Sequence, residues 1–368
     1  MPRPDFRAAE RFFLALVGHL PMASVGVMHL IHWPEGLPGP WDLAPEHGFQ
    51  GTLVAARASL ADVAREYRTI DDIRLDDHPT AGERAGGDIL MEMPQGREAE
   101  RMAIEAAVAA LPEGGRLWLF GNRESGIVTL GRRFEPVQNE LSCGHLRLVS
   151  LPAGARRRES PGRKRRRPEV SLEEGFFHYV AEGVTLASRP GIFSWQRPDP
   201  ASLLLLRALG GVEKDWNSLK MLDFGCGSGL LGVVLARRWP SLRVVMSDDQ
   251  WGAVISARRS VVLNGVGDRC QVIAENGIGA VLEGERFDLI VSNPSFHRGV
   301  ATDHGVVRDF IPRSHALLAP GGELWLVGSR FLDYGAPLAA HFADVRRVAQ
   351  DEGFDVWCAA KRRTAGNR

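Results

Sequence analysis

Short apolar runs alternate with longer amphipathic stretches throughout the second half of the chain. Runs with the length of buried strands lie at 218–224, 242–248, 270–274, 287–293 and 323–329. The stretches at 229–239 and 251–265 have apolar residues at helical spacing, and the second ends in Asn-Gly, a common helix stop. This alternation predicts an α/β fold, in which helices cover both faces of a parallel sheet and ligands bind at the carboxyl ends of its strands.

One turn-to-strand pattern occurs in both halves of the chain. LPEGGRLWLFGNR at 111–123 and LAPGGELWLVGSR at 318–330 match at eight of thirteen positions. Each copy follows a helical pattern, EAERMAIEAAVAALPE in the first half and DHGVVRDFIPRSHALLAP in the second. Chance convergence on a common turn is one explanation, but the similar spacing of helix and strand favours a duplicated domain. The mildly apolar N-terminus is then the first helix and strand of the first copy.

The length of the chain agrees with a duplication. At 368 residues it is about twice the usual size of a domain. Hydrophobic residues make up 44% and charged residues 24%, as in ordinary folded proteins. We expect a first domain at 1–154, a basic linker at 155–170 and a second domain at 171–368.

The expected linker holds the densest charge in the chain. Eight of the twelve residues from Arg156 to Arg167 are basic, and prolines and a glycine in and beside the run oppose a helix. Because the formal net charge of the whole chain is 0, only this cluster suggests binding to a polyanion. It is either a solvated tether or a segment whose side chains, among them Arg163, Arg165 and Arg166, also contact a phosphate backbone.

The remaining composition argues against several classes of protein. The four cysteines are far apart and form no CxxC pair, which speaks against a zinc site or a disulfide framework. No apolar run approaches the roughly 20 residues of a membrane span, and the N-terminus is a poor signal peptide. We expect a cytoplasmic protein that uses no metal and no membrane. We also expect a monomer.

Three glycines directly after the first strand of the second half form the clearest ligand motif. In the stretch Asp223-Phe224-Gly225-Cys226-Gly227-Ser228-Gly229 they allow a sharp turn and a close approach of a ligand to the backbone. The dinucleotide fingerprint fails because Leu230 stands at its third glycine, and a Walker loop fails because no Lys-Ser or Lys-Thr follows. An ordinary glycine turn is the alternative.

Polar residues at the ends of the next two strands favour a nucleoside ligand. Asp248 ends the second strand 19 residues after Gly229, close to the distance at which an acidic side chain binds ribose hydroxyls, and Asp249 is the second candidate. After the third strand, Asn276 can contact an adenine edge or belong to a plain loop. One extended ligand across three neighbouring strand ends would use all of these groups.

The fourth strand of this half ends in Ser-Asn-Pro-Ser-Phe-His at 292–297. The exocyclic amine of a nucleobase is a poor nucleophile, because its lone pair is delocalised into the ring. If the side-chain oxygen of Asn293 and the carbonyl oxygen of Pro294 each accept an N–H bond, the nitrogen becomes pyramidal and can attack a sulfonium methyl group. Phe296 offers a face on which the base can stack, after flipping if it lies in a helix, and His297 is a candidate substrate contact or a solvated side chain. An ordinary strand-ending turn is the alternative.

These motifs resemble those of a known family. The pattern DxGxGxG at 223–229 is similar to motif I of class I S-adenosylmethionine-dependent methyltransferases. NPSFH at 293–297 resembles the NPPFH signature of the ribosomal RNA guanine-N2 methyltransferases of the RsmC and RlmG type. GIFSWQRPDPASLLLLRAL is similar to a lead-in segment that folds over the cofactor in that family, with matching positions at Phe193, Asp199 and Ser202.

The resemblance spans about residues 175–363 and continues more weakly into the first half. It implies two tandem Rossmann-like methyltransferase domains, of which the N-terminal one is degenerate, lacks both motifs, and recognises RNA or supports folding. It implies S-adenosylmethionine as cofactor and a guanine in ribosomal RNA, or in the small ribosomal subunit, as substrate. With the loop and strand ends above, it assigns the cofactor contacts to Phe193, Asp199, Ser202, Asp223, Gly225, Cys226, Gly227, Gly229, Asp248, Asp249, Asn276 and Asn293.

One position departs from the family pattern, because Ser295 replaces a second proline. Only the carbonyl of Pro294 enters the chemistry, so we expect activity to survive. The DPASLLLL stretch favours 16S over 23S RNA as substrate. Methylation of 23S guanine N2, of an adenine N6 or of a protein glutamine remains an alternative, as does an RNA-binding assembly factor without catalytic activity.

Overall fold

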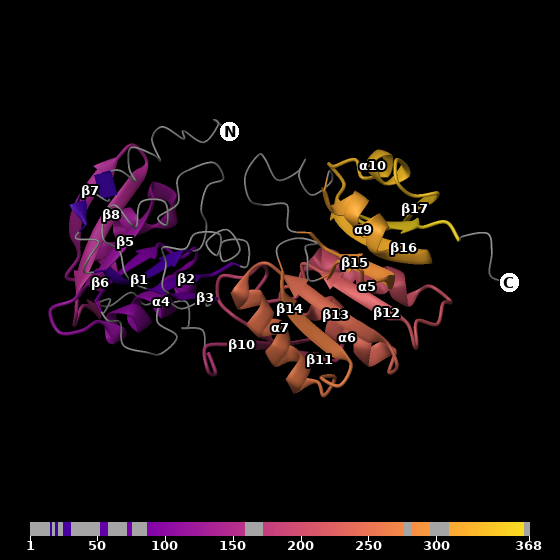
Figure 1. The fold of residues 1–368 in the computed structure, drawn as a ribbon, viewed down its shortest axis with the longest axis horizontal. Helices are drawn as coiled ribbons and strands as arrows, with labels where there is room; N and C mark the ends of the chain where they lie inside the picture. The colour runs from indigo at the N-terminus through magenta and orange to yellow at the C-terminus, as the bar shows by residue number, and fades with distance from the viewer. Residues whose placement is uncertain are drawn as a thin grey trace. The chain divides into compact units, whose positions relative to one another are not determined.

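The computed structural model divides the chain into two compact units, Met1–Ser171 and Leu172–Arg368. The residues that the structure describes are 15–16, 19–20, 25–30, 52–57, 72–75, 87–158, 172–275, 282–294 and 309–363. Each unit contains one seven-stranded sheet with its own apolar core (Figure 1).

The second unit has the alternation of strands and helices that the apolar pattern predicts. Its strands are β10 (Phe177–Ala181), β11 (Val184–Ser188), β12 (Lys220–Phe224), β13 (Arg243–Asp248), β14 (Cys270–Ala274), β15 (Phe287–Ser292), β16 (Leu318–Ser329), β17 (Asp344–Gln350) and β18 (Phe354–Ala360). Its described helices are α5 (Pro200–Gly210), α6 (Leu230–Arg238), α7 (Trp251–Leu263), α9 (Ile311–Leu317) and α10 (Gly335–Ala339).

The strand order of this sheet is β14-β13-β12-β15-β16-β18-β17. The first five strands in that order are parallel, and β18 is antiparallel to both β16 and β17. The order reverses at β12, which has β13 on one side and β15 on the other. Such a reversal opens a crevice at the carboxyl ends of the strands, where ligands bind in doubly wound sheets.

Helices cover both faces of the second sheet. On β15, Leu289 and Val291 pack in one core with residues of α5, α6 and α7, while Ile290 packs in a second core with α9 and α10. Because both faces are buried, the strands are apolar at successive positions, which explains the continuous runs in the sequence. None of the helices in the described ranges is long and apolar enough to cross a membrane.

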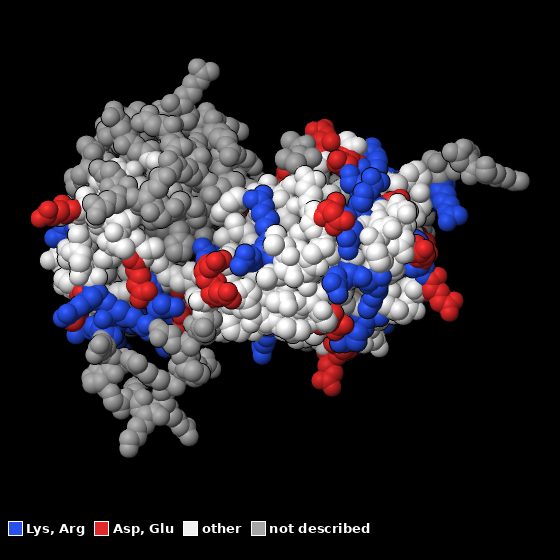
Figure 2. Space-filling view, turned by 90° about the horizontal axis from the view of Figure 1, so that it is seen from below, with Lys and Arg blue, Asp and Glu red and all other residues white. Residues whose placement is uncertain are grey.

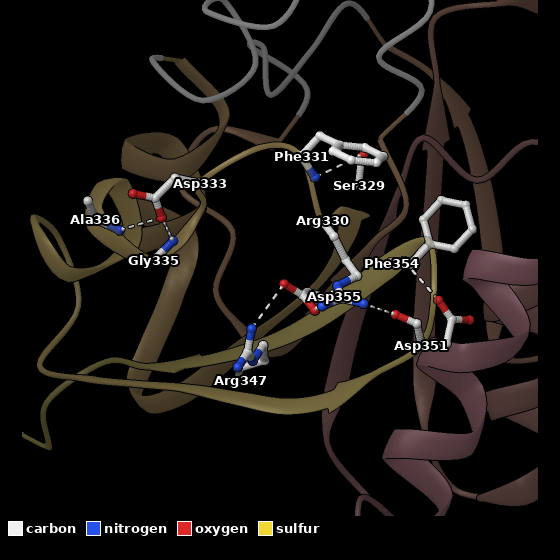
Figure 3. A network of polar contacts seen from close by, with 10 residues as sticks. All are labelled: Ser329, Arg330, Phe331, Asp333, Gly335, Ala336, Arg347, Asp351, Phe354 and Asp355. Atoms are coloured by element: carbon white, nitrogen blue, oxygen red, sulfur yellow. Dashed lines mark hydrogen bonds and ion pairs between the residues drawn. The ribbon is translucent and has the colours of Figure 1, made fainter.

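Charged side chains hold the antiparallel end of this sheet together. Arg330, directly after β16, donates from Nη1 to the carbonyl of Asp351 at 2.9 Å, and its Nε lies 3.7 Å from Oδ1 of Asp355. Arg347 on β17 donates to Oδ2 of Asp355 at 3.4 Å (Figure 3). The turn after β16 is thereby fixed, and it carries Phe331, whose side chain is 91% exposed.

The first unit repeats the strand order of the second. Its strands are β1 (Val25–Leu30), β2 (Thr52–Ala55), β3 (Asp72–Leu75), β4 (Asp88–Glu92), β5 (Arg116–Asn122), β6 (Phe134–Glu135), β7 (Gln138–Cys143), β8 (Leu146–Pro152) and β9 (Arg156–Arg157). Its described helices are α4 (Arg97–Ala110) and the 3-10 helices η2 (Arg123–Ser125) and η3 (Ile127–Arg132).

The order of this sheet is β3-β2-β1-β4-β5-β8-β7, with β8 antiparallel to β5 and β7. When only the strands of each seven-stranded sheet are numbered along the chain, both sheets have the order 3-2-1-4-5-7-6. The repeated turn-to-strand pattern falls on β5 and β16, which occupy the same place in the two sheets. The prediction of two tandem Rossmann-like domains is confirmed.

The basic run begins inside the first unit. Arg156–Arg157 forms β9, which pairs with β6 in an antiparallel two-stranded sheet. The segment expected to be a linker therefore starts with residues that hydrogen-bond to the folded unit. Arg163, Arg165 and Arg166 lie outside the described residues.

Candidate active site

The glycine loop joins β12 to α6 at the point where the strand order reverses. Gly225, Gly227 and Gly229 have φ values of 71°, 54° and 86°, a region that other residues rarely adopt. The backbone N–H groups of Gly225 and Cys226 donate to the carbonyl of Ser247 on β13 at 2.9 and 3.0 Å. The backbone of the loop itself therefore holds it against the end of β13.

Asp223, near the end of β12, lies beneath this loop. Its side chain is fully buried, and its Oδ2 accepts a hydrogen bond from the backbone N–H of Gly232 at 2.8 Å. Burial raises the pKa of Asp223 to about 7; the bond from Gly232 opposes the rise and the nearby Asp248 adds to it. Burial also raises the pKa of the Cys226 thiol, which therefore stays protonated. The Asp223 carboxyl supports the loop and the start of α6 from inside.

Asp248 ends β13 in direct contact with the loop. Its Oδ2 accepts from the backbone N–H of Gly227 at 3.0 Å, and its Oδ1 accepts from that of Gln250 at 2.9 Å. The side chain of Gln250 donates to the carbonyl of Gly191 at 3.3 Å. This bond ties the lead-in segment before α5 to the strand end where a carboxylate is predicted to bind ribose.

Asn293 follows β15, on the other side of β12. Its Nδ2 donates to Oδ2 of Asp199 at 2.7 Å and to Oγ of Ser202 at 2.8 Å. The same oxygen of Asp199 caps α5 by accepting from the backbone N–H of Ser202 at 2.9 Å. A carboxylate can only accept hydrogen bonds, so the nitrogen of the amide must face Asp199. The Oδ1 of Asn293 therefore faces away from Asp199 and Ser202, and no described residue donates a hydrogen bond to it.

Two further contacts are made by Phe224, the residue directly before the glycine loop. The hydroxyl of Ser292 donates to the carbonyl of Phe224, the last residue of β12, at 2.8 Å. The ring of Phe224 stacks on that of Phe310, with centroids 4.7 Å apart. Asn293 and the buried Pro294 follow directly, so the Asn-Pro pair and the loop occupy neighbouring strand ends.

A hairpin that the sequence analysis missed, β10–β11, contacts the loop as well. The hydroxyl groups of Tyr179 on β10 and Ser228 in the loop are 3.0 Å apart. On the other side of the hairpin, backbone N–H groups of β11 and of Arg189, the residue after it, donate to the side chains of Ser256, Ser260 and Asn264. These three polar residues recur at every fourth position along and just after α7, which is the signal that the sequence offered for a strand beside this helix.

Most of the predicted site residues that the structure describes lie together. The residues at or in contact with the carboxyl ends of β12, β13 and β15 are Asp199, Ser202, Asp223, Gly225, Cys226, Gly227, Gly229, Asp248, Asn293 and Pro294. Asp249 is half-buried next to Asp248, and Phe193 is 46% exposed in the lead-in segment. Asn276, Phe296 and His297 lie outside the described residues. The described part of the chain contains no cluster of three or more His, Cys, Asp or Glu side chains that could hold a metal.

A doubly wound sheet with this loop after its first strand and an acidic residue at the end of its second defines a class I S-adenosylmethionine-dependent methyltransferase. In agreement, residues 183–358 match the family model of the methyltransferase small domain. A curated relative from Pseudomonas aeruginosa, ribosomal RNA small subunit methyltransferase C, is 33% identical over 299 residues, which are 80% of this chain and 85% of the relative. This chain belongs to the ribosomal RNA small subunit methyltransferase C family.

Further relatives agree with this assignment. The protein of the same name from Pectobacterium atrosepticum is 33% identical over 271 residues, which are 74% of this chain and 73% of the relative. A solved structure of a T. thermophilus 16S rRNA N2 methyltransferase (RsmC) in complex with AdoMet and guanosine matches with a TM-score of 0.73 and 26% identity. The match covers 94% of this chain and 92% of that one. The resemblance noted in the sequence is thus confirmed, with the small-subunit type favoured.

Proposed function

We propose that this protein transfers the methyl group of S-adenosylmethionine to the exocyclic N2 amine of a guanine in 16S ribosomal RNA. The family to which the chain belongs supports this reaction, as does the neighbour described with AdoMet and guanosine. The observation that carries the proposal is the orientation of the Asn293 amide, whose nitrogen is held by Asp199 and Ser202 and whose oxygen is left to accept a hydrogen bond from a ligand.

The glycine loop and Asp248 fit the cofactor. A Cβ atom built on Gly225 or Gly227 would meet nothing within 4 Å, so the outer side of the loop is open to a ligand. Asp248, at the adjoining strand end, supplies a carboxylate suited to ribose hydroxyls. When bound, S-adenosylmethionine supplies a methyl group activated by a sulfonium centre.

Asn293 and Pro294 would hold the guanine amine. The side-chain oxygen of Asn293 and the main-chain oxygen of Pro294 each accept one N–H bond, which localises the lone pair on nitrogen and aims it at the methyl group. The same two oxygens would stabilise the positive charge that develops on nitrogen as the N–C bond forms and the methyl–sulfur bond breaks; the sulfur would leave as a neutral thioether and the extra proton on nitrogen would pass to solvent.

Asp199 and Ser202 would act through Asn293. Rotation of the amide by 180° would break its bond to Asp199 and set its oxygen against that carboxylate, whereas the Ser202 hydroxyl can donate to an oxygen as well as accept from a nitrogen. Since a hydrogen bond to a charged group contributes about 1.5–3 kcal/mol, the rotated form is disfavoured by at least about that amount. The reacting amine therefore meets an acceptor and not a donor. In this proposal the two residues orient Asn293, whereas the family resemblance had assigned them to the cofactor.

Mass spectrometry of the methylated RNA tests this function. The purified protein is incubated with S-adenosylmethionine and either 16S or 23S RNA from cells that lack the gene, as free RNA and as subunits, and the products are digested to nucleosides. We expect N2-methylguanosine from the 16S substrate. Methylation of adenine, or of 23S RNA alone, would overturn the proposed specificity, and binding of RNA without any methyl transfer would favour the assembly factor.

A further inference from the structure

A cluster of arginines lies on the first unit where the end of η3, the β6–β9 pair and the start of α4 come together. The members of this arginine surface are Arg97, Arg132, Arg133, Arg156, Arg157 and Arg158. Figure 2 shows Lys and Arg side chains gathered on one part of the first unit. Two of its segments, at 97 and at 132–133, lie outside the basic run that the sequence displays.

The arginine surface stands on a packed support. Its strand β9 pairs with β6, and the backbone N–H of Arg158 donates to the carbonyl of Arg133 at 2.7 Å. Ile127, Leu130 and Phe134, from η3 and β6, are 1%, 0% and 3% exposed in the core of the unit. The fold therefore fixes the backbone from which the arginines at 132–133 and 156–158 extend.

Carboxylates neutralise only part of the charge on this surface. Glu100, which is 4% exposed, accepts two hydrogen bonds from Arg133 at 2.5 and 3.0 Å. Oε1 of Glu135 lies 3.4 Å from Nε of Arg156, and its Oε2 lies 3.2 Å from Nη2 of Arg158. Among the described residues, Glu100 and Glu135 pair with Arg133, Arg156 and Arg158 and so offset two of the positive charges on this surface.

The excess charge is concentrated and open to solvent. Arg97 and Arg157 both act electrostatically on Glu100 and lower its pKa, against the larger effect of burial, which raises it. Arg97, Arg132 and Arg157 are exposed. Within the described ranges, neither Arg97 nor Arg132 forms an ion pair. Charges from three separate segments therefore meet on one small area of the first unit.

We propose that the arginine surface binds the phosphate backbone of the substrate RNA. The inference rests on the proposed function and assigns a task to the unit that has no catalytic motif. One guanidinium group can donate two parallel hydrogen bonds to the oxygens of one phosphate. Contacts of this kind position an RNA without recognising its base sequence. The arginine surface is also continuous in the chain with the basic residues at 163–167.

The salt dependence of RNA binding tests this proposal on the full-length protein without cofactor. The variant carries Arg97→Gln, Arg132→Gln and Arg157→Gln, and it keeps Arg133, Arg156 and Arg158, which bind Glu100 and Glu135. The probe is a fluorescein-labelled RNA hairpin of mixed sequence, and its affinity is measured by anisotropy at several salt concentrations. We expect the slope of log K against log salt to fall by about 2–3, because each lost phosphate contact removes about 0.7–0.9. A second hairpin of unrelated sequence should show the same change.

Two further variants control for total charge and for chemistry. Arg207→Gln, Arg237→Gln and Arg243→Gln remove the same charge from exposed positions of the second unit, in the last turns of α5 and α6 and at the start of β13. This control should keep the slope of the unmodified protein. The triple change to lysine at 97, 132 and 157 retains the charge, so this variant should keep most of the slope of the unmodified protein. An unchanged slope in the glutamine variant, or an equal loss in the second-unit control, would overturn the proposal.

The folding and the methyl-transfer activity of the triple glutamine variant are measured separately. Far-UV circular dichroism and the melting temperature check that the triple variant is folded; if it is not, the single change Arg132→Gln should still lower the slope by about 0.7–0.9. In methyl-transfer assays the folded variant should show a higher KM for RNA and an unchanged kcat. If the protein binds RNA through this surface but transfers no methyl group, the proposed function fails and the present inference stands.

Discussion

The two sheets of this protein have the same strand order, but their strand ends carry different groups. The register of the strands identifies equivalent positions. In the repeated pattern Trp118 corresponds to Trp325, and these residues lie beside Leu90 on β4 and Val291 on β15. Leu90 and Val291 are therefore equivalent. When the strand pairing of each sheet is followed from these two residues, Met28 is equivalent to Asp223, Ala55 to Asp248, and Glu92 to Asn293.

The difference separates what builds the fold from what builds the site. Met28 and Ala55 are 1% and 0% exposed, so they serve the packing of the sheet as well as any apolar residue and offer no carboxylate. Glu92 has no side-chain N–H with which to hold a fixed orientation as Asn293 does. The sheet needs only apolar strands in a given order, whereas the chemistry needs one loop and a few side chains at strand ends.

The largest effect should come from removing the amide of Asn293. Asn293→Ala should lower kcat by about 10² or more, because a preorganised acceptor is lost, while the affinity for S-adenosylmethionine measured by calorimetry stays nearly the same. Glu92→Ala, the equivalent change in the first unit, should leave kcat unaltered. Equal turnover in the protein with and without the Asn293 amide would remove this residue from the mechanism.

A smaller effect should follow from releasing that amide. Asp199→Ala should lower kcat about 10-fold and Ser202→Ala by less, since each removes one of the two bonds that orient Asn293. Asp199→Asn, which retains an acceptor oxygen and the helix cap, should recover part of the loss.

The split between kcat and KM distinguishes the two roles of Asp199. An orienting role predicts a change in kcat at nearly constant KM for S-adenosylmethionine, and a rise in that KM alone would return Asp199 to the cofactor site. Asp333→Ala is the matched control for stability, because Asp333 accepts from the backbone N–H of Gly335 at 3.0 Å at the start of α10 and does not contact Asn293 (Figure 3). It should cost about 1 kcal/mol of stability and leave kcat unchanged.

The smallest effect concerns the buried carboxyl of Asp223, whose equivalent in the first unit is Met28. The pKa of Asp223 is about 7 in the folded protein against an ordinary value of 3.8, so the folded state keeps a proton that the unfolded chain releases. Stability from this group is present at low pH and is lost as pH rises towards and through 7. Between pH 6 and pH 7 the free energy of unfolding of the second unit should fall by about 1 kcal/mol relative to Asp223→Asn, measured by denaturant titration. Parallel pH profiles would contradict this shift.

The frame of the second unit follows from local sequence pattern. The helix predicted at 251–265 is α7, which ends at Leu263 just before Asn264, and the apolar runs at 270–274 and 287–293 are β14 and β15 within one residue. The strand expected at 323–329 begins earlier, at Leu318, because Leu318 already pairs with Phe287 on β15. The Gly-Gly turn is an irregularity within β16, with Gly321 at a φ of 80° and the pairing resuming at Glu323. Of the helical pattern before it, the described part forms α9, which spans Ile311–Leu317.

Contacts between distant segments could not be predicted in the same way. Asp199 before a proline indicates a helix cap, but nothing in that pattern indicates which strand end α5 will pack against. Its contact with Asn293 joins residues 94 positions apart. The arginine surface is hidden for the same reason, since Arg97 comes close to Arg157 only through the packing of α4 and the pairing of β9.

The long-range contact between Asp199 and Asn293 also sets the time at which activity can arise during synthesis. The strand before Asn293, β15, is held between β12 and β16, and β16 is completed only near the C-terminal end of the chain. A nascent chain that has emerged as far as Asn293 still lacks one neighbour of this strand. We therefore expect methyl transfer to begin only after β16 has emerged, so that a fragment ending before Leu318 leaves the RNA of the translating ribosome unmodified.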